Sequence, residues 1–157
     1  NLNPNKKTII NHRLKINADK FLTINKSFIP NGDFKNVNST PFDFRKEKKI
    51  GDDINKNNEQ INIAKGYDHC FVLNKNQKPA AELSELESGR LIQIFTDQPG
   101  IQLYTGNHLK GVFSKNQGLC LETQHFPNSP NVNSFPTTLL KSNTNYYSKT
   151  SYHFKLI

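Results

Sequence analysis

Two carboxylates stand beside apolar segments of the sequence, where an acidic side chain is unusual. Asp68 precedes the run Cys70-Phe71-Val72-Leu73, and Glu122 lies near the end of Leu119-Cys120-Leu121-Glu122-Thr123. Burying an ionised carboxylate is costly unless the group is hydrogen-bonded, so each position indicates a carboxylate that is either satisfied or used in chemistry. A structural interpretation stays open: Asp68 would form an Asx-type turn at the start of a strand, and Glu122 would face outward.

The motifs of several common enzyme classes do not occur in the sequence. It contains neither a Gly-rich phosphate loop nor a Gly-x-Ser-x-Gly elbow, and its five histidines lack the spacing of metal ligands. Cys70 and Cys120 are too few for a disulfide scaffold and lack the paired spacing of a zinc site. We expect both cysteines to be small buried apolar residues, and their number favours a reducing, cytoplasmic location.

The net charge of +8, from 21 Lys and Arg against 13 Asp and Glu, raises the question of an acidic partner. The lysines are scattered singly or in pairs, and the compact run Arg45-Lys46-Glu47-Lys48-Lys49 is interrupted by an acid. We therefore expect no nucleic-acid binding, although a basic β-domain for an acidic partner remains an alternative that steep salt dependence of binding would reveal. No segment approaches the roughly 18 apolar residues that cross a bilayer, so we expect no membrane span.

The elements that must position these side chains are predicted to be short antiparallel strands. A chain of 157 residues is expected to form a single domain over residues 1–157, and its 11 Phe and 5 Tyr predict a core built on large rings. Alternating or β-rich segments bounded by Gly, Pro, Asn or Ser predict strands at 12–16, 21–24, 70–73, 80–83, 91–96, 101–105, 119–123 and 151–156. The fold class is therefore all-β.

The intervening segments are predicted to be turns and loops. Residues 29–33 and 39–41 have the Pro, Gly and Asn content of tight turns, and residues 85–90 are expected to connect two strands. The charged segment 45–62 is expected to be a solvated loop or a short surface helix. Residues 126–131 contain too much proline for a strand interior and are expected to be an irregular crossing segment.

Six motifs, read in order, give the sequence a specific resemblance to a known family. They are Ile29-Pro30-Asn31-Gly32, Ser39-Thr40-Pro41-Phe42-Asp43-Phe44-Arg45, Gly66-Tyr67-Asp68-His69, Ser88-Gly89-Arg90, Gln98-Pro99-Gly100-Ile101-Gln102-Leu103-Tyr104-Thr105-Gly106-Asn107 and Cys120-Leu121-Glu122-Thr123-Gln124-His125-Phe126-Pro127. Together they resemble the aldose 1-epimerases, the galactose mutarotases, over essentially the whole chain. The resemblance implies a large antiparallel β-sandwich, the mutarotase-like supersandwich, with a partly desolvated sugar cleft across its face.

The resemblance also implies roles for three residues. Glu122 would be the general base, Asp68 would accept hydrogen bonds from sugar hydroxyls, and Gln102 would line the sugar pocket. The implied reaction interconverts the α and β anomers of hexoses such as galactose and glucose by acid–base ring opening, and it implies no cofactor and no metal. Where the family frequently has Asn, the sequence has Cys70, which strand alternation places on the same face as Asp68.

One departure from the family pattern concerns the general acid. Asn1-Leu2 resembles the tail of a motif whose earlier part holds the family's acid histidine, and none of the five histidines here stands at that position. We therefore expect the chain to be the C-terminal portion of such an enzyme, inactive alone, with the N-terminal part of the same fold as its partner. Apolar sheet edges would then make the isolated chain prone to aggregation or dependent on the missing half. A non-catalytic carbohydrate-binding β-sandwich domain is the alternative.

Overall fold

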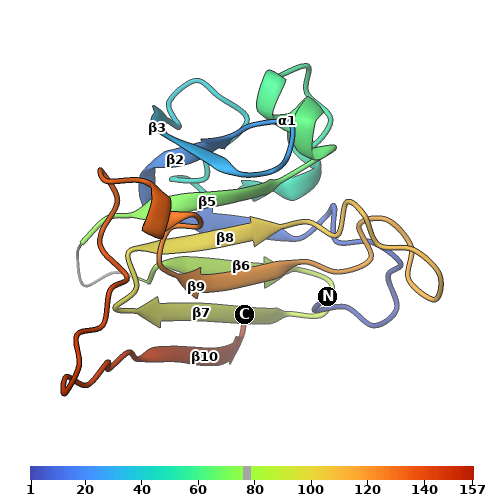
Figure 1. Cartoon of the computed structure of the whole chain (residues 1–157). Coiled ribbons are helices and arrows are strands. Elements are labelled where there is room, and N and C mark those ends of the chain that lie inside the picture. The colour runs from blue at the N-terminus through green and yellow to red at the C-terminus, as the bar shows by residue number, and fades with distance from the viewer. Residues whose placement is uncertain (76–78) are drawn as a thin grey trace.

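The computed structural model describes residues 1–75 and 79–157, and in this part of the chain the strands form two five-stranded antiparallel sheets. Figure 1 shows the sheets stacked with the connecting loops at their ends. Sheet A has the order β10 (Thr150–Leu156), β7 (Arg90–Thr96), β6 (Ala81–Glu85), β1 (Arg13–Ile16) and β4 (Lys48–Lys49). Sheet B has the order β3 (Pro30–Asn36), β2 (Ala18–Ile24), β5 (Asp68–Leu73), β8 (Gly100–Tyr104) and β9 (Cys120–Gln124). The all-β prediction is confirmed.

The main core lies between the two sheets and is rich in aromatic rings. Leu14 and Leu83 of sheet A and Phe71 and Leu103 of sheet B are all at most 5% exposed and belong to one cluster. Phe42, from the segment between β3 and β4, stacks on the ring of Phe21 in β2, with 4.0 Å between the ring centroids. The large rings therefore provide the burial that a mostly polar composition requires.

The first predicted turn lies in the wrong place. Pro30 begins strand β3, and the chain reverses just before it, where Phe28 N–H donates to the Asn25 carbonyl and Asn25 N–H donates to the Ile29 carbonyl. The Asn25 side chain accepts from Ser27 N–H at 2.8 Å, an Asx turn. Proline is tolerated in β3 because this strand is at the edge of its sheet, where a missing N–H removes no ladder bond.

The charged segment 45–62 is more structured than its composition predicts. It contains β4, the 3-10 helix η1 (Ile50–Asp52) and the start of helix α1 (Glu59–Ala64). Ile50, Ile54 and Ile61 are at most 4% exposed, so three sparse isoleucines anchor the segment to the core. Gln60 is also buried, and its side chain bonds the backbone N–H and carbonyl of Ile24 at 2.8 and 3.2 Å, which joins α1 to β2.

The other predictions for strands and connections agree with the structure. Strands occur at each of the eight predicted segments, residues 86–89 form the turn between β6 and β7, and the Pro-rich crossing segment contains the 3-10 helix η2 (Ser129–Asn131). The two ends of the chain lie near this turn: Arg90 donates to the Leu2 carbonyl at 2.7 Å, and Ile157 N–H donates to the Gly89 carbonyl. Among the described residues, no helix has the length and apolarity needed to cross a membrane.

Candidate functional site

Strand pairing in sheet B places the three predicted site residues on one face. Cys70 of β5 is paired with Gln102 of β8, which is paired with Glu122 of β9. Asp68 is two residues before Cys70 and therefore shares its face. Directly paired residues of an antiparallel sheet have their side chains side by side, so three segments far apart in the sequence contribute to one surface.

Two of the three side chains are joined directly. Gln102 Nε2 donates to Asp68 Oδ1 at 2.7 Å, and both residues are half-buried. Gln102 Oε1 is buried and has no hydrogen-bond partner among the described residues. This oxygen is therefore an acceptor of the Asp68–Gln102 pair to which no donor is bonded. Glu122 differs from the expectation of a partly desolvated cleft: it is exposed and lies on the edge strand of the sheet.

A buried polar network holds the segment that leads into Asp68. Asn107 donates from Nδ2 to the carbonyls of Ala64 and Tyr67 at 3.0 and 2.8 Å, and it accepts from the Thr105 hydroxyl at 2.6 Å. Gly66 has a φ of +141°, and a Cβ there would overlap the Asn107 side chain. Glycine is therefore required both by its conformation and by this close approach.

Tyr67 anchors the same segment from its other side. Its buried hydroxyl donates to the Pro41 carbonyl at 2.9 Å, and its backbone N–H donates to the Thr105 hydroxyl at 3.1 Å. Desolvation raises the pKa of the phenol, so Tyr67 is a neutral hydrogen-bond donor. The start of β5 is thus fixed to the turn at residues 39–41 and to Thr105, which directly follows β8, and these contacts set the position of Asp68.

His69 belongs to the core and not to the surface that carries Asp68. Its Nδ1 accepts from Asp68 N–H at 3.1 Å, which makes Nε2 the protonated nitrogen, and its ring lies edge-on to Phe42 with centroids 4.7 Å apart. The residue is fully buried, and burial lowers its pKa to about 3. His69 is neutral at physiological pH and acts as a packing residue.

The other four histidines come from separate segments of the chain. His12 is buried behind the N-terminal segment, and burial, followed by the charge of the N-terminal amine, lowers its pKa to about 4. The rings of His125 and His153 contact Tyr146 and Phe95, and His108 lies in the loop that follows β8. None of the five histidines is paired across the strands with Glu122.

One end of this sheet face is covered by an aromatic cluster. Leu22, Cys70, Phe126 and Phe135 are at most 6% exposed and pack together. A Cβ on Gly100 would lie 2.7 Å from Cys70 Sγ and 3.1 Å from the Phe126 ring, so glycine allows the crossing segment to approach the strands. Cys70 shares the face of Asp68 as predicted but is covered by this cluster, and burial raises its pKa to about 12.

Sequence reasoning missed two residues of the open end of this face. Asp68 is paired directly with Tyr104, and Tyr104 with Cys120, so these side chains form a row beside Gln102 and Glu122. Tyr104 is two residues after Gln102, and Cys120 is two residues before Glu122, so strand alternation alone places both on this face. The prediction that Cys120 is buried is wrong, because its thiol is exposed. Partial burial and then the nearby Glu122 carboxylate raise the pKa of this thiol.

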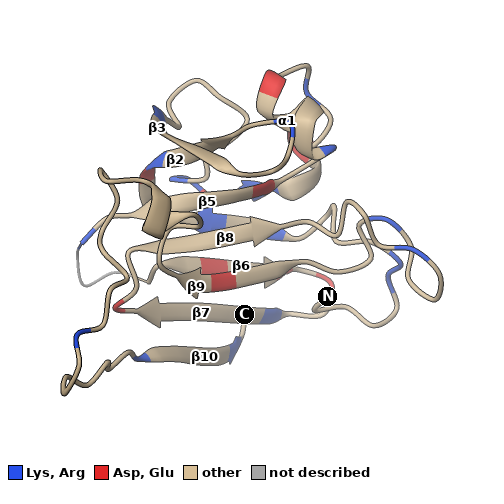
Figure 2. Ribbon diagram, in the orientation of Figure 1, with Lys and Arg blue, Asp and Glu red and all other residues tan. Residues whose placement is uncertain are grey.

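The charged side chains are dispersed over the molecule. Figure 2 shows Lys and Arg on strands of both sheets and in the loops, with acidic residues among them. Several of the cations are paired, as in the bonds from Lys48 and Lys56 to Asp53 at 2.6 and 2.7 Å. In the part of the chain that the structure describes, no group of three or more His, Cys, Asp or Glu is arranged to hold a metal ion.

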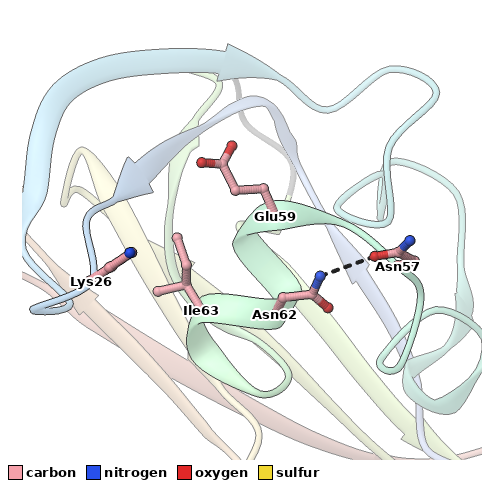
Figure 3. Close-up of a pocket in the computed structure, with 5 residues that line it drawn as sticks. All are labelled: Lys26, Asn57, Glu59, Asn62 and Ile63. Atoms are coloured by element: carbon pink, nitrogen blue, oxygen red, sulfur yellow. Dashed lines mark hydrogen bonds between the residues drawn. The ribbon is translucent and has the colours of Figure 1, made fainter.

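A separate hollow lies between α1 and the turn after β2. Figure 3 shows its lining, in which Lys26 comes from the β2–β3 turn and Asn57, Glu59, Asn62 and Ile63 come from α1 and the residues before it. Asn62 Nδ2 donates to Asn57 Oδ1 at 3.1 Å, and the four polar side chains are exposed. The hollow contains none of the three predicted site residues, and we assign it no chemistry.

Comparison with known proteins gives a consistent match along the chain. Residues 1–153 match the family described as aldose 1-epimerase. The chain is 37% identical to the galactose mutarotase of Sus scrofa over 94% of this chain and 45% of that protein, and 36% identical to the aldose 1-epimerase of Haemophilus influenzae over 92% and 45%. It therefore spans about half the length of the curated relatives it matches.

Solved structures are similar as well. The crystal structure of a GalM/aldose epimerase homologue from C. elegans superposes with a TM-score of 0.88 at 26% identity, covering 98% of this chain and 48% of that one. The galactose 1-epimerase from Lactobacillus acidophilus superposes with a TM-score of 0.79 at 30% identity, covering 96% and 45%.

Proposed function

The chain belongs to the aldose 1-epimerase family, and on this premise we propose that it carries the general base and the sugar-binding side chains of a mutarotase acting on hexoses such as galactose and glucose. The observation that carries the proposal is a set of contacts across three strands: Glu122 is paired with Gln102, whose amide donates to Asp68 at 2.7 Å. A base and hydroxyl-binding groups are therefore neighbours on one sheet face.

In the proposed reaction, Glu122 removes the proton from the anomeric hydroxyl of the pyranose. The electron pair of that O–H bond forms the carbonyl at C1, the bond from C1 to the ring oxygen breaks, and an acid protonates the ring oxygen. Rotation about C1–C2 and the reverse steps then close the ring with the other anomeric configuration. One base and one acid are sufficient for this exchange.

Asp68 and Gln102 hold the sugar for this proton transfer. The Asp68 carboxylate already accepts one hydrogen bond from Gln102, and its remaining lone pairs suit sugar hydroxyl donors. Because Gln102 lies between Asp68 and Glu122, its side chain sets the lateral position of a ring bound to both. Substrate contacts at the two ends would then orient the anomeric carbon toward the base.

The acid is proposed to come from an N-terminal part of the same fold, of which this chain would be the C-terminal portion. The positions of the five histidines support this proposal: two are buried and neutral, and none is paired across the strands with Glu122. The exposed position of Glu122 on the edge strand β9 supports it too, because a neighbouring segment would supply the missing enclosure.

Polarimetry tests the proposal. Freshly dissolved α-D-galactose and α-D-glucose are followed to anomeric equilibrium with the chain alone, with the chain joined to the proposed N-terminal part, and with buffer. Glu122→Gln keeps the side-chain shape and removes the base, so we expect it to lower turnover by roughly 10²–10⁴-fold. Glu59→Gln, an exposed change on α1, is the matched control and should leave turnover unchanged.

The result also decides between the enzyme and a non-catalytic carbohydrate-binding domain. Full turnover by Glu122→Gln would remove Glu122 from the mechanism. Sugar binding without acceleration, in the joined protein as well as in the chain alone, would favour the binding domain. The exposure of Glu122 is the observation that favours this second candidate, because a general base is expected in a partly desolvated cleft.

A further inference from the structure

Tyr104 occupies the position directly across the strands from Asp68. Their Cα positions are paired in the β5–β8 ladder, so the half-buried Tyr104 side chain lies next to the carboxylate on the same sheet face. On its other side Tyr104 is paired with the exposed Cys120 of β9. The aromatic cluster of Phe126 and Phe135 covers the opposite end of this face and leaves the row of Tyr104 outside it.

The ring of Tyr104 is held in place by the loop that follows its strand. Its hydroxyl accepts a hydrogen bond from the backbone N–H of His108 at 3.1 Å. The His108 ring is in turn packed edge-on against Phe28, with centroids 5.6 Å apart. Phe28 has a φ of +63°, an unusual conformation for a bulky side chain, so the β2–β3 turn presents this ring at a backbone cost.

These contacts leave Tyr104 with two unused properties. Because the hydroxyl is the acceptor in its bond with His108, its own proton is available to a further acceptor. The ring is fixed and borders a carboxylate, and sugars have both hydroxyl groups and an apolar C–H surface. A fixed aromatic ring beside an acceptor matches both, as in other small-ligand sites that combine apolar walls with a few polar groups.

We propose that Tyr104 is a further sugar-contacting and specificity-determining residue, whose ring packs against the C–H face of the pyranose that Asp68 holds by its hydroxyls. This proposal rests on the proposed function. The hydroxyl of Tyr104 donates to an oxygen of the same sugar, and the His108 N–H keeps the ring in the orientation that allows both contacts. Hexoses that differ in one hydroxyl configuration differ in their C–H face, so the ring distinguishes between them.

Binding of methyl β-D-galactopyranoside and methyl β-D-glucopyranoside tests the role, because these glycosides cannot mutarotate and report binding alone. Affinities are measured by NMR titration for the chain, alone and joined to the proposed N-terminal part, and for Tyr104→Phe, Tyr104→Leu and Asp68→Asn in both forms. We expect Tyr104→Leu to weaken binding about tenfold and to reduce the difference between the two sugars. Tyr104→Phe keeps the ring and should lose only a few-fold. Tyr152→Leu, an exposed change on β10, is the control for loss of a tyrosine and should have no effect.

The outcomes separate this role from the proposed function. Loss of binding in Asp68→Asn together with unchanged affinity and selectivity in Tyr104→Leu would overturn the role of Tyr104 and keep the sugar site. Absence of binding by the unaltered chain, both alone and joined to the proposed N-terminal part, would overturn both. A Tyr104→Phe variant as impaired as Tyr104→Leu would overturn the packing role of the ring. The amide spectrum of each variant is compared with that of the unaltered chain, so that only folded variants are scored.

Discussion

The Asp68 carboxylate accepts a 2.7 Å hydrogen bond from the side-chain amide of Gln102, although the two residues are 34 positions apart in the sequence. The bond crosses diagonally from β5 to β8, because Asp68 is paired with Tyr104 and Gln102 with Cys70, and Gln102 is in turn paired with Glu122 of β9. It gives the carboxylate a fixed orientation before any sugar binds, and pre-orientation of this kind reduces the entropy lost on binding.

Asp68 and Gln102 should act together in sugar binding. Asp68→Ala should weaken binding strongly, Gln102→Ala should be milder, and the double variant should lose less than the sum of the two, because each change already disorders the shared bond. A coupling of about 0.5–3 kcal/mol in a double-mutant cycle on sugar affinity is expected. In sheet A, Gln93 donates to Glu82 at 2.8 Å. Gln93→Ala removes this similar hydrogen bond and is the control, which should leave the sugar affinity unchanged. Fully additive losses would contradict the coupling.

Asn107 should contribute strongly to stability. Asn107→Ala leaves the Ala64 carbonyl without its side-chain donor in a buried site, whereas the Tyr67 carbonyl keeps its bonds from Thr105, so the free energy of unfolding should fall by about 1–3 kcal/mol. Urea denaturation followed by circular dichroism measures the change. Asn133→Ala, at an exposed position, is the control and should lie within about 0.5 kcal/mol of the unaltered chain. Equal midpoints for the two variants would show that the network is dispensable.

The two buried histidines should make the fold sensitive to acid. Burial lowers the pKa of His12 to about 4 and that of His69 to about 3, whereas an unfolded histidine titrates near 6.5. Between these values the unfolded chain binds more protons, so stability is complete above about pH 6.5 and falls as the pH decreases. We expect a loss of roughly 2 kcal/mol for each histidine between pH 7 and pH 5.

Between pH 7 and pH 5 the change in stability reports the histidines and not the carboxylates, because carboxylates titrate mostly below pH 5. Unfolding free energies from urea titrations at half-unit pH steps provide the measurement. His153 is exposed, so His153→Gln should keep the same slope and serve as the control. A stability that does not change between pH 7 and pH 5 would mean that His12 and His69 are not buried in their neutral forms.

The two thiols should differ in reactivity. Cys120 is exposed and Cys70 is buried, so one thiol should react with iodoacetamide in the native chain and the second only after unfolding. Because the Glu122 carboxylate contributes to the raised pKa of the Cys120 thiol, Glu122→Gln should increase the alkylation rate at fixed pH. Glu59→Gln should leave the rate unchanged. Mass spectrometry of the labelled peptides identifies the thiol, and rapid labelling of Cys70 would contradict its burial.

The sequence determined eight of the ten strands of the described residues, their antiparallel nature and the family, but not β3 and β4. Short β-rich segments between Gly, Pro and Asn are local signals, and all the predicted strand segments occur as strands. The face shared by Asp68 and Cys70 also followed from the sequence, because side chains alternate along any strand. The three candidate residues came from their motifs, and the structure brings Asp68, Gln102 and Glu122 to one face of sheet B.

The tertiary structure decided what depends on neighbours distant in the sequence. Pro30 could start a strand because β3 lies at the edge of its sheet, and three isoleucines of a charged segment became buried because a core surface faces them. Cys70 and Cys120 have the same chemistry, yet the first lies under Phe126 and the second is exposed. The pairing of Asp68 with Tyr104 depends on the register between two strands, and register is set by the packing of whole sheets, which no local pattern contains.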